Sequence, residues 1–355
     1  MYSRRNINVD LIKVFALILV CTMHFFLTGY YELKYEVRTI PFIAIRNYSA
    51  ICVPLFIMVT GYLNFGRVWS KKLYLNIVRV FFLYATVIVI CSVFDIYFGE
   101  PYAKVLEGSY LLTIIKNIVS FEYYGWYMNM YFGLVVIAPG INIIYEKLAT
   151  KHNKRLMIIH LLLIISIPVT LLDIFSTSGH PILGYILPTW WKGMYPVVYY
   201  VLGLYFREYG VDYKNKKMGF LFVATIVVST LSYYFAGVSW ETTTYPSIFL
   251  VIMASITFLK IINLNLSINK GLLPLVVFIS NSTLPAYLLS WIVDTLVMRP
   301  FIKGAISDLQ LRLYLLPTLI PSFILVVILT FIFKYFYKYS IELIVNKVIN
   351  KFIAY

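Results

Sequence analysis

The chain has 355 residues, of which 61% are hydrophobic and only 13% are charged. This composition excludes an ordinary soluble protein and a disordered one, and it indicates a protein that crosses a membrane several times. The formal net charge of +15 is spread over short segments between apolar runs. It therefore indicates membrane topology and gives no support to nucleic-acid binding.

Apolar runs of spanning length recur along the whole chain. A spanning helix needs about 20 mostly apolar residues, and about ten stretches meet this criterion. We therefore expect an all-α fold, a polytopic membrane bundle of about ten transmembrane helices that forms a single domain over residues 1–355. The predicted spans are 9–29, 41–63, 77–98, 127–145, 156–175, 190–206, 218–237, 246–263, 272–293 and 313–336.

The distribution of basic residues predicts the topology of these spans. Ten spans place both termini on the same side of the membrane. With both termini in the cytoplasm, most lysines and arginines fall in the inner loops, as the positive-inside rule requires. The sequence thus predicts a multi-pass protein of a cell membrane, the bacterial inner membrane or a plasma membrane, in contact with the lipid bilayer.

The first predicted span, "NVDLIKVFALILVCTMHFF" (8–26), carries three ionisable residues. On a helix, Lys13 and His24 lie only about 20° apart around the axis and about 16 Å apart along it. Asp10, three residues before Lys13, falls on the same stripe. Ionisable groups within a spanning helix normally face the interior of a bundle and mark a functional path. Alternatively, Lys13 extends to the headgroups, or His24 is a hydrogen-bonded packing residue.

This stripe resembles the first-helix signature of the integral-membrane acyltransferase 3 family, in which an acidic residue, a basic residue and a histidine share one helix. Four later segments are similar to family segments and follow in the same order. They are "VPLFIMVTGYLNFGR" (53–67), "YGWYMNMYFGLVVIAPGIN" (124–142), "YYVLGLYFRE" (199–208) and "ISNSTLPAYLLSW" (279–291). The resemblance covers nearly the full chain.

The sequence departs from the family pattern at several positions. Lys13 stands where the family usually has arginine, and Thr60 stands where it has serine. Ser290 replaces a histidine of many members, so no second histidine is expected there. The basic pair near the start of the third span is incomplete, with Asn76 and Arg79 at the relevant spacing.

The resemblance implies an acyltransferase, more narrowly an O-acetyltransferase. Its donor substrate would be cytoplasmic acetyl-CoA, and its acceptor a hydroxyl of a cell-surface or lipid-linked glycan. His24 is the expected catalytic residue, either as general base on the sugar hydroxyl or through a transient acetyl-imidazole. Asp10 is expected to hold Lys13 in place.

Two further groups of residues are expected to bind the substrates. Cationic side chains on the inner side form charge-assisted hydrogen bonds with donor phosphates. The expected donor contacts are Arg79, Lys71 and Lys72, and Lys13 is a further candidate for this role. Aromatic rings and an amide at the outer end of the fourth span are suited to a sugar, although such rings are also typical of the interfacial aromatic belt. The expected acceptor contacts are Trp126, Tyr127 and Asn129.

Two other functions compete with this interpretation. A transporter or flippase of a lipid-linked sugar would also have many spans, and it predicts paired half-repeats and charged residues on several helices. A catalytically silent membrane scaffold would make the stripe on the first span incidental. No metal site is predicted, because the histidines and cysteines are scattered without ligand spacing. The sequence does not predict the oligomeric state.

Overall fold

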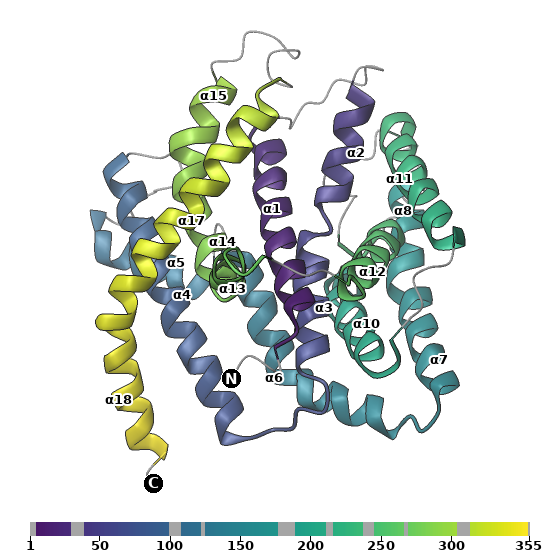
Figure 1. Ribbon diagram of the computed structural model, residues 1–355, viewed down its shortest axis with the longest axis horizontal. Helices are drawn as coiled ribbons and strands as arrows, with labels where there is room; N and C mark the ends of the chain where they lie inside the picture. Colours follow the sequence, from purple (N-terminus) through teal and green to yellow (C-terminus); the bar gives the residue numbers. More distant parts are fainter. Residues whose placement is uncertain are drawn as a thin grey trace. The chain divides into compact units, whose positions relative to one another are not determined.

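The chain folds into helices in its computed structural model. The structure describes residues 5–29, 39–98, 108–121, 125–176, 189–210, 216–236, 245–265, 269–303 and 313–353, and these ranges contain no strand. In chain order, the segments (Figure 1) are α1 (Ile7–Gly29), α2 (Ile40–Ser49), α3 (Cys52–Leu63), α4 (Lys71–Phe98), α5 (Tyr110–Ser120), α6 (Trp126–Lys147), α7 (Lys151–Leu161), η4 (Leu162–Ser166), α8 (Ile167–Ser176), α9 (Thr189–Gly193), α10 (Tyr195–Tyr209), α11 (Lys216–Ala236), α12 (Ile248–Ile262), α13 (Leu273–Ser280), α14 (Thr283–Val293), η6 (Asp294–Met298), α15 (Arg299–Lys303), α17 (Leu315–Tyr339) and α18 (Ile341–Ile353). The two η segments are π-helical.

The helices confirm an all-α protein with several membrane-spanning segments. Within the described ranges, seven helical stretches are long and apolar enough to cross a membrane, or eight if α13 and the helix after it form one interrupted span. The predicted span 190–206 is divided between α9 and α10, and α12 has 15 residues, fewer than the ~20 of a full span. Ten spans and cytoplasmic termini therefore stay predictions.

The chain divides into two units, which are described separately. Unit 1 comprises Met1–Arg67 and Ala138–Ser280, and unit 2 comprises Val68–Ile137 and Asn281–Tyr355. The helix α6 contributes to both units and contains Pro139, which removes one backbone hydrogen bond of the helix. That the whole chain is one functional domain stays a prediction.

Within unit 1, α1 is enclosed by other helices. It packs against α3, α13, α12 and α2 (Figure 1). Every residue from Ala16 to Phe26 is buried except Ile18, which is half-buried. A helix that is buried on nearly all sides must be apolar all round, which explains why α1 lacks an ordinary polar face. Of its ionisable side chains, Asp10 and His24 are buried and Lys13 is half-buried.

The closest helix pair of unit 1, α3 and α10, depends on two glycines. A Cβ atom added at Gly61 would overlap the backbone carbonyl of Tyr200, and one added at Gly203 would overlap the backbone carbonyl of Met58. Each glycine thus lets the backbone of the facing helix approach. Small residues at such crossings are the usual basis of close helix packing in membranes.

We expect Gly61→Ala and Gly203→Ala each to destabilise the protein by about 1–3 kcal/mol, the usual range for overpacking a tight contact. The clash involves backbone atoms on both sides, so rotation of a side chain cannot relieve it. The control is Gly219→Ala on α11, where an added Cβ meets nothing within 4 Å and helix propensity improves. Thermal unfolding in detergent measures the effect, and equal melting temperatures for all three variants would contradict this explanation.

A second cluster of unit 1 joins the ends of α6, α7 and α10. The buried Lys154 ammonium donates hydrogen bonds of 2.7 and 2.8 Å to the two carboxylate oxygens of Glu208, and the Tyr145 hydroxyl donates one of 2.7 Å to Oε2. The Lys154 Nζ also lies 4.6 Å from the centroid of the Tyr145 ring. Burial raises the pKa of Glu208, but the hydrogen bonds from Lys154 and Tyr145 and the Lys154 charge outweigh it and lower the pKa.

The cluster predicts acid lability. A carboxyl whose pKa is lower in the folded state than in the unfolded state adds stability above its unfolded pKa, and this stability is lost as the pH falls through the folded value. We therefore expect the melting temperature to decrease as the pH falls below 4.5, the ordinary value for Glu208. Glu208→Gln should have a lower melting temperature at neutral pH and a flatter acid limb. An acid limb as steep in Glu208→Gln as in the native chain would show that other carboxyls cause the loss.

Candidate functional site

The predicted catalytic residues lie on the enclosed helix α1. Asp10 is 3% exposed and His24 is 8% exposed, so neither faces the lipid, and Lys13 is half-buried. The backbone carbonyl of His24 accepts a hydrogen bond of 2.8 Å from the Thr28 hydroxyl. The two ends of the predicted stripe, Asp10 and His24, are therefore enclosed by protein.

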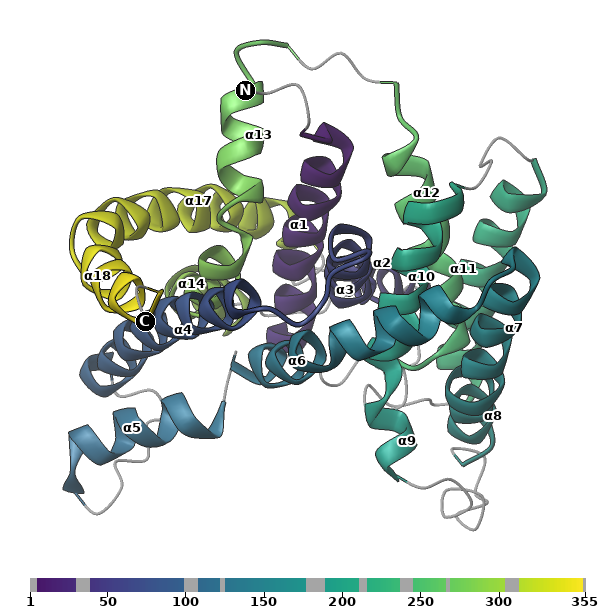
Figure 2. The ribbon, with the colours of Figure 1, turned by 90° about the horizontal axis from the view of Figure 1, so that it is seen from below.

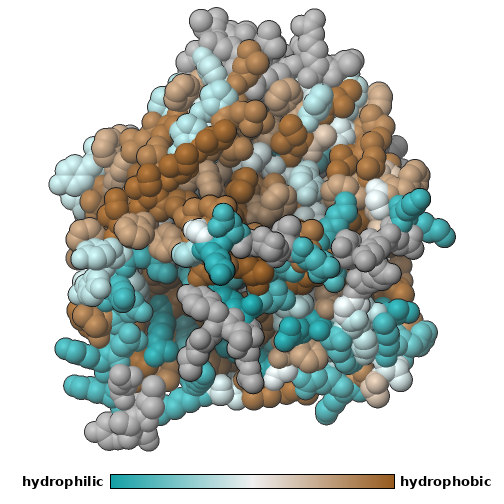
Figure 3. All heavy atoms as spheres, viewed as in Figure 1, coloured by the Kyte–Doolittle hydropathy of each residue, from teal (hydrophilic) through white to brown (hydrophobic). Residues whose placement is uncertain are grey.

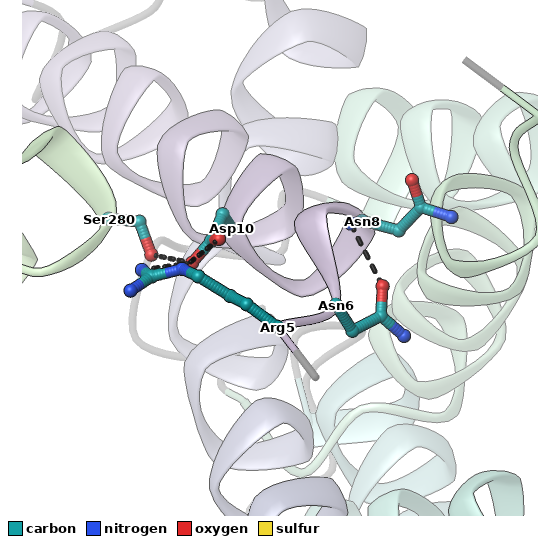
Figure 4. A network of polar contacts seen from close by, with 5 residues as sticks. All are labelled: Arg5, Asn6, Asn8, Asp10 and Ser280. Carbon is teal, nitrogen blue, oxygen red and sulfur yellow. Dashed lines mark hydrogen bonds and ion pairs between the residues drawn. The ribbon is translucent and has the colours of Figure 1, made fainter. Parts of the chain in front are cut away.

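The carboxylate of Asp10 is the centre of a polar network at the start of α1 (Figure 4). Arg5 donates two hydrogen bonds to it, from Nε to Oδ2 at 2.6 Å and from Nη2 to Oδ1 at 2.8 Å. Ser280, the last residue of α13, donates from its hydroxyl to Oδ1. Charge-assisted bonds of this kind are roughly twice as strong as neutral ones, so they hold the carboxylate in one orientation.

The first turn of α1 is also anchored to the end of α12. The Asn6 side chain accepts a hydrogen bond of 3.0 Å from the backbone N–H of Asn8, as an N-cap residue does. The Asn8 side-chain amide donates hydrogen bonds of 2.9 Å to the backbone carbonyls of Ile262 and Leu264. Carbonyls at the end of a helix have no N–H partner within the helix, and Asn8 supplies one here. These bonds fix where α1 begins.

The structure adds two partners that the sequence did not predict for Asp10. The expectation was that Asp10 holds Lys13, and Lys13 does lie within electrostatic range of both Asp10 and Arg5. The hydrogen bonds of the carboxylate, however, come from Arg5 and Ser280. Arg5 precedes the apolar run, so helical spacing within the run did not include it. Ser280 lies 270 residues away in the sequence, so no local pattern joins it to Asp10.

The predicted donor contacts lie in unit 2, on α4. Lys71 and Lys72 are the first residues of this helix and are exposed. The half-buried Arg79 donates from Nε to the Asn346 side chain at 3.2 Å and from Nη1 to the Asn76 side chain at 3.0 Å. Neutral amides thus orient the guanidinium without cancelling its charge.

The predicted acceptor contacts also lie in unit 2, in the first turn of α6. Trp126 is 39% exposed, Asn129 is exposed and Tyr127 is half-buried. The Tyr127 ring makes edge contacts with the rings of Trp126 and Tyr287, at centroid distances of 6.2 and 5.7 Å. The turn therefore presents an aromatic surface beside an amide.

Two buried acids of unit 2 were missed by the sequence analysis. Asp95 on α4 is 3% exposed and accepts a hydrogen bond of 2.7 Å from the indole N–H of Trp291. The guanidinium carbon of Arg299 lies 4.5 Å from the centroid of the Trp291 ring. Asp294 is 1% exposed and begins the π-helical segment η6. In the sequence, each of these acids stands within an apolar segment, "SVFDIYF" (92–98) or "WIVDTLV" (291–297). An acid in such a segment is by default a candidate functional residue inside the membrane.

Comparison with known proteins identifies the domain type. A family model described as an acyltransferase domain, acyltransferase 3, matches residues 6–337. This range includes α1 and most of α17 and stops before α18. No curated protein and no solved structure matches the chain. Among the described residues, no group of three or more His, Cys, Asp or Glu side chains is placed to hold a metal ion.

The network at Asp10 predicts strong coupling with Arg5. In a double-mutant cycle of thermal stability, Arg5→Gln and Asp10→Asn should couple by about 1–3 kcal/mol, because each single variant leaves the other polar group without its charged partner. The matched cycle combines Lys13→Gln with Asp10→Asn. A larger coupling energy for Lys13 than for Arg5 would contradict the hydrogen-bond assignment and favour Lys13 as the main partner.

Proposed function

The chain belongs to the acyltransferase 3 family, and on this premise we propose that it is a membrane O-acetyltransferase. It moves an acetyl group from acetyl-CoA on the cytoplasmic side to a hydroxyl of a cell-surface or lipid-linked glycan. The matched range covers α1 through most of α17, so the proposal concerns the chain as one functional domain. It places the protein in the cell membrane with several spans.

The observation that supports this proposal best is the position of His24. The His24 imidazole is 8% exposed on a helix that packs against four others of unit 1, and it shares its stripe with Lys13 and Asp10. Imidazole exchanges protons near neutral pH, and in a family of acyltransferases it supplies the base that acyl transfer requires.

The proposed reaction needs one proton transfer in each direction. His24 accepts the proton of the sugar hydroxyl while the oxygen attacks the thioester carbonyl. The tetrahedral intermediate collapses with cleavage of the carbon–sulfur bond, and the imidazolium returns the proton to the coenzyme A thiolate. In the alternative route, the imidazole itself attacks the thioester and coenzyme A leaves as its thiolate. The acetyl-imidazole then passes the acetyl group to the sugar hydroxyl, whose proton goes to the thiolate.

The remaining residues are assigned to substrate binding. Arg79, with Lys71 and Lys72, binds the donor phosphates, and the amides of Asn76 and Asn346 already orient its guanidinium. The charge of Lys13 lies within range of Asp10 and Arg5 and serves to position the donor. The acceptor sugar stacks on the aromatic surface at the start of α6, formed by Trp126 and Tyr127, with Asn129 as its hydrogen-bond partner.

We expect His24→Gln to lower the rate of acetyl transfer by about 10²–10⁴-fold, the usual contribution of a general base. The assay uses purified protein, radiolabelled acetyl-CoA and a glycan extract of the host cell. The matched control is His160→Gln, which removes an exposed histidine on α7 and should leave the rate unchanged.

The melting temperature of each variant separates loss of chemistry from loss of folding. Transfer by folded His24→Gln at the native rate would remove His24 from the mechanism. Movement of a lipid-linked sugar across vesicles by the native chain, without incorporation of acetyl label, would favour the transporter.

A further inference from the structure

The last helix, α18, lies outside the range that matches the acyltransferase domain. It follows α17, whose 25 residues extend about 37 Å and suffice to cross a hydrocarbon core of about 30 Å. The 13 residues of α18 extend only about 20 Å. The helix is therefore too short to be a span of its own.

One side of α18 packs against other helices of unit 2. Val345 is 5% exposed and Ile349 is 2% exposed, and α18 packs on α4 and α17 (Figure 2). The Asn346 side chain accepts the hydrogen bond from Arg79 on α4. The helix is thus held at a defined rotation, and the residues on its other sides face outward in a defined order.

The outward side combines an apolar strip with lysines. Ile344 is 63% exposed and Val348 is 47% exposed, on adjoining turns of the helix. Helical geometry places Lys351 about 20° and Lys347 about 60° from Ile344, on the same edge of the strip, and both lysines are exposed. An apolar strip with lysines along its edge is the pattern of helices that lie in a membrane interface.

The end of α17 continues this basic character. Lys334 and Lys338 lie in its last two turns, and Glu342 is the acidic residue in the first turn of α18. In the face shown in Figure 3, hydrophobic atoms cover most of α17, whereas hydrophilic atoms lie beside hydrophobic ones along α18. The apolar helix α17 is therefore followed, from its last turns onward, by a region that carries several lysines.

We propose that α18 is a membrane-surface helix that binds anionic phospholipid headgroups. Ile344 and Val348 enter the boundary between headgroups and acyl chains, and Lys347 and Lys351 contact lipid phosphates while their apolar stems cover the strip. Lysines at the edge of the strip disfavour a second copy of the chain as its occupant, because in a two-fold contact the same residues face their own equivalents.

Depth measurements on the full-length chain test this arrangement. A fluorophore is attached to Val348→Cys or to Leu343→Cys, and each protein is reconstituted in phosphatidylcholine vesicles with or without phosphatidylglycerol. Leu343 is a matched control, because it is also apolar and is 52% exposed but lies about 140° from Val348. The native chain, whose Cys21, Cys52 and Cys91 are buried, measures background labelling.

We expect a nitroxide-bearing lipid to quench the Val348→Cys label more than the Leu343→Cys label, and aqueous iodide to do the opposite. Phosphatidylglycerol should strengthen the lipid quenching. Lys347→Gln combined with Lys351→Gln should remove this gain. Each lysine is expected to strengthen the binding of the helix to the anionic membrane by about fivefold, which corresponds to about 1 kcal/mol. Lys216→Gln combined with Lys217→Gln, at the start of α11, should leave it unchanged.

The remaining outcomes would overturn the proposal. Equal lipid quenching at positions 343 and 348 would show that the strip does not enter the membrane. Quenching that responds neither to phosphatidylglycerol nor to the two lysines would exclude recognition of anionic headgroups. A disulfide-linked dimer of Val348→Cys, formed without lipid quenching, would show that a second copy covers the strip. None of these readouts depends on acetyl transfer, so they are independent of the proposed function.

Discussion

The absence of bulk water inside an apolar helix bundle is the constraint on which this structure depends. A buried charge there is costly unless the protein itself supplies its partners. Asp10 has such partners in Arg5 and Ser280, and its place in the first turn of α1 puts it near the positive end of the helix dipole. Because these bonds fix the rotation of α1 about its axis, they also fix the direction in which His24 points, three to four turns further along the same rigid helix.

The fold was predictable from the sequence where the pattern is local. Long apolar runs at α1, α4 and α17 produced long helices close to the predicted bounds. The stripe on α1 was predictable for the same reason, since helical spacing alone places Asp10 and His24 on one side. Breaks inside the predicted spans were less predictable, because an apolar window does not reveal where a helix is interrupted. The span 41–63 divides into α2 and α3, and the span 190–206 divides into α9 and α10.

The partners within the site were much less predictable. The contact between Ser280 and Asp10 joins residues 270 positions apart, and Arg5 reaches back to Asp10 from before the apolar run. No periodicity within one span contains either contact. The same holds for Asp95, whose carboxylate is satisfied by the Trp291 indole. A polar residue in a span can be recognised from sequence, but its partner is determined by tertiary packing, and the partner decides whether the residue is structural or reactive.

The packing of α3 against α10 gives a structural reason for two glycines of the family motifs. Gly61 lies in "VPLFIMVTGYLNFGR" and Gly203 lies in "YYVLGLYFRE", two segments about 140 residues apart that resembled the family independently. In the structure they meet at one crossing, where each glycine admits the backbone of the other helix. The two motifs therefore record a single physical requirement, the close approach of two helices. This requirement explains the glycines without substrate contact.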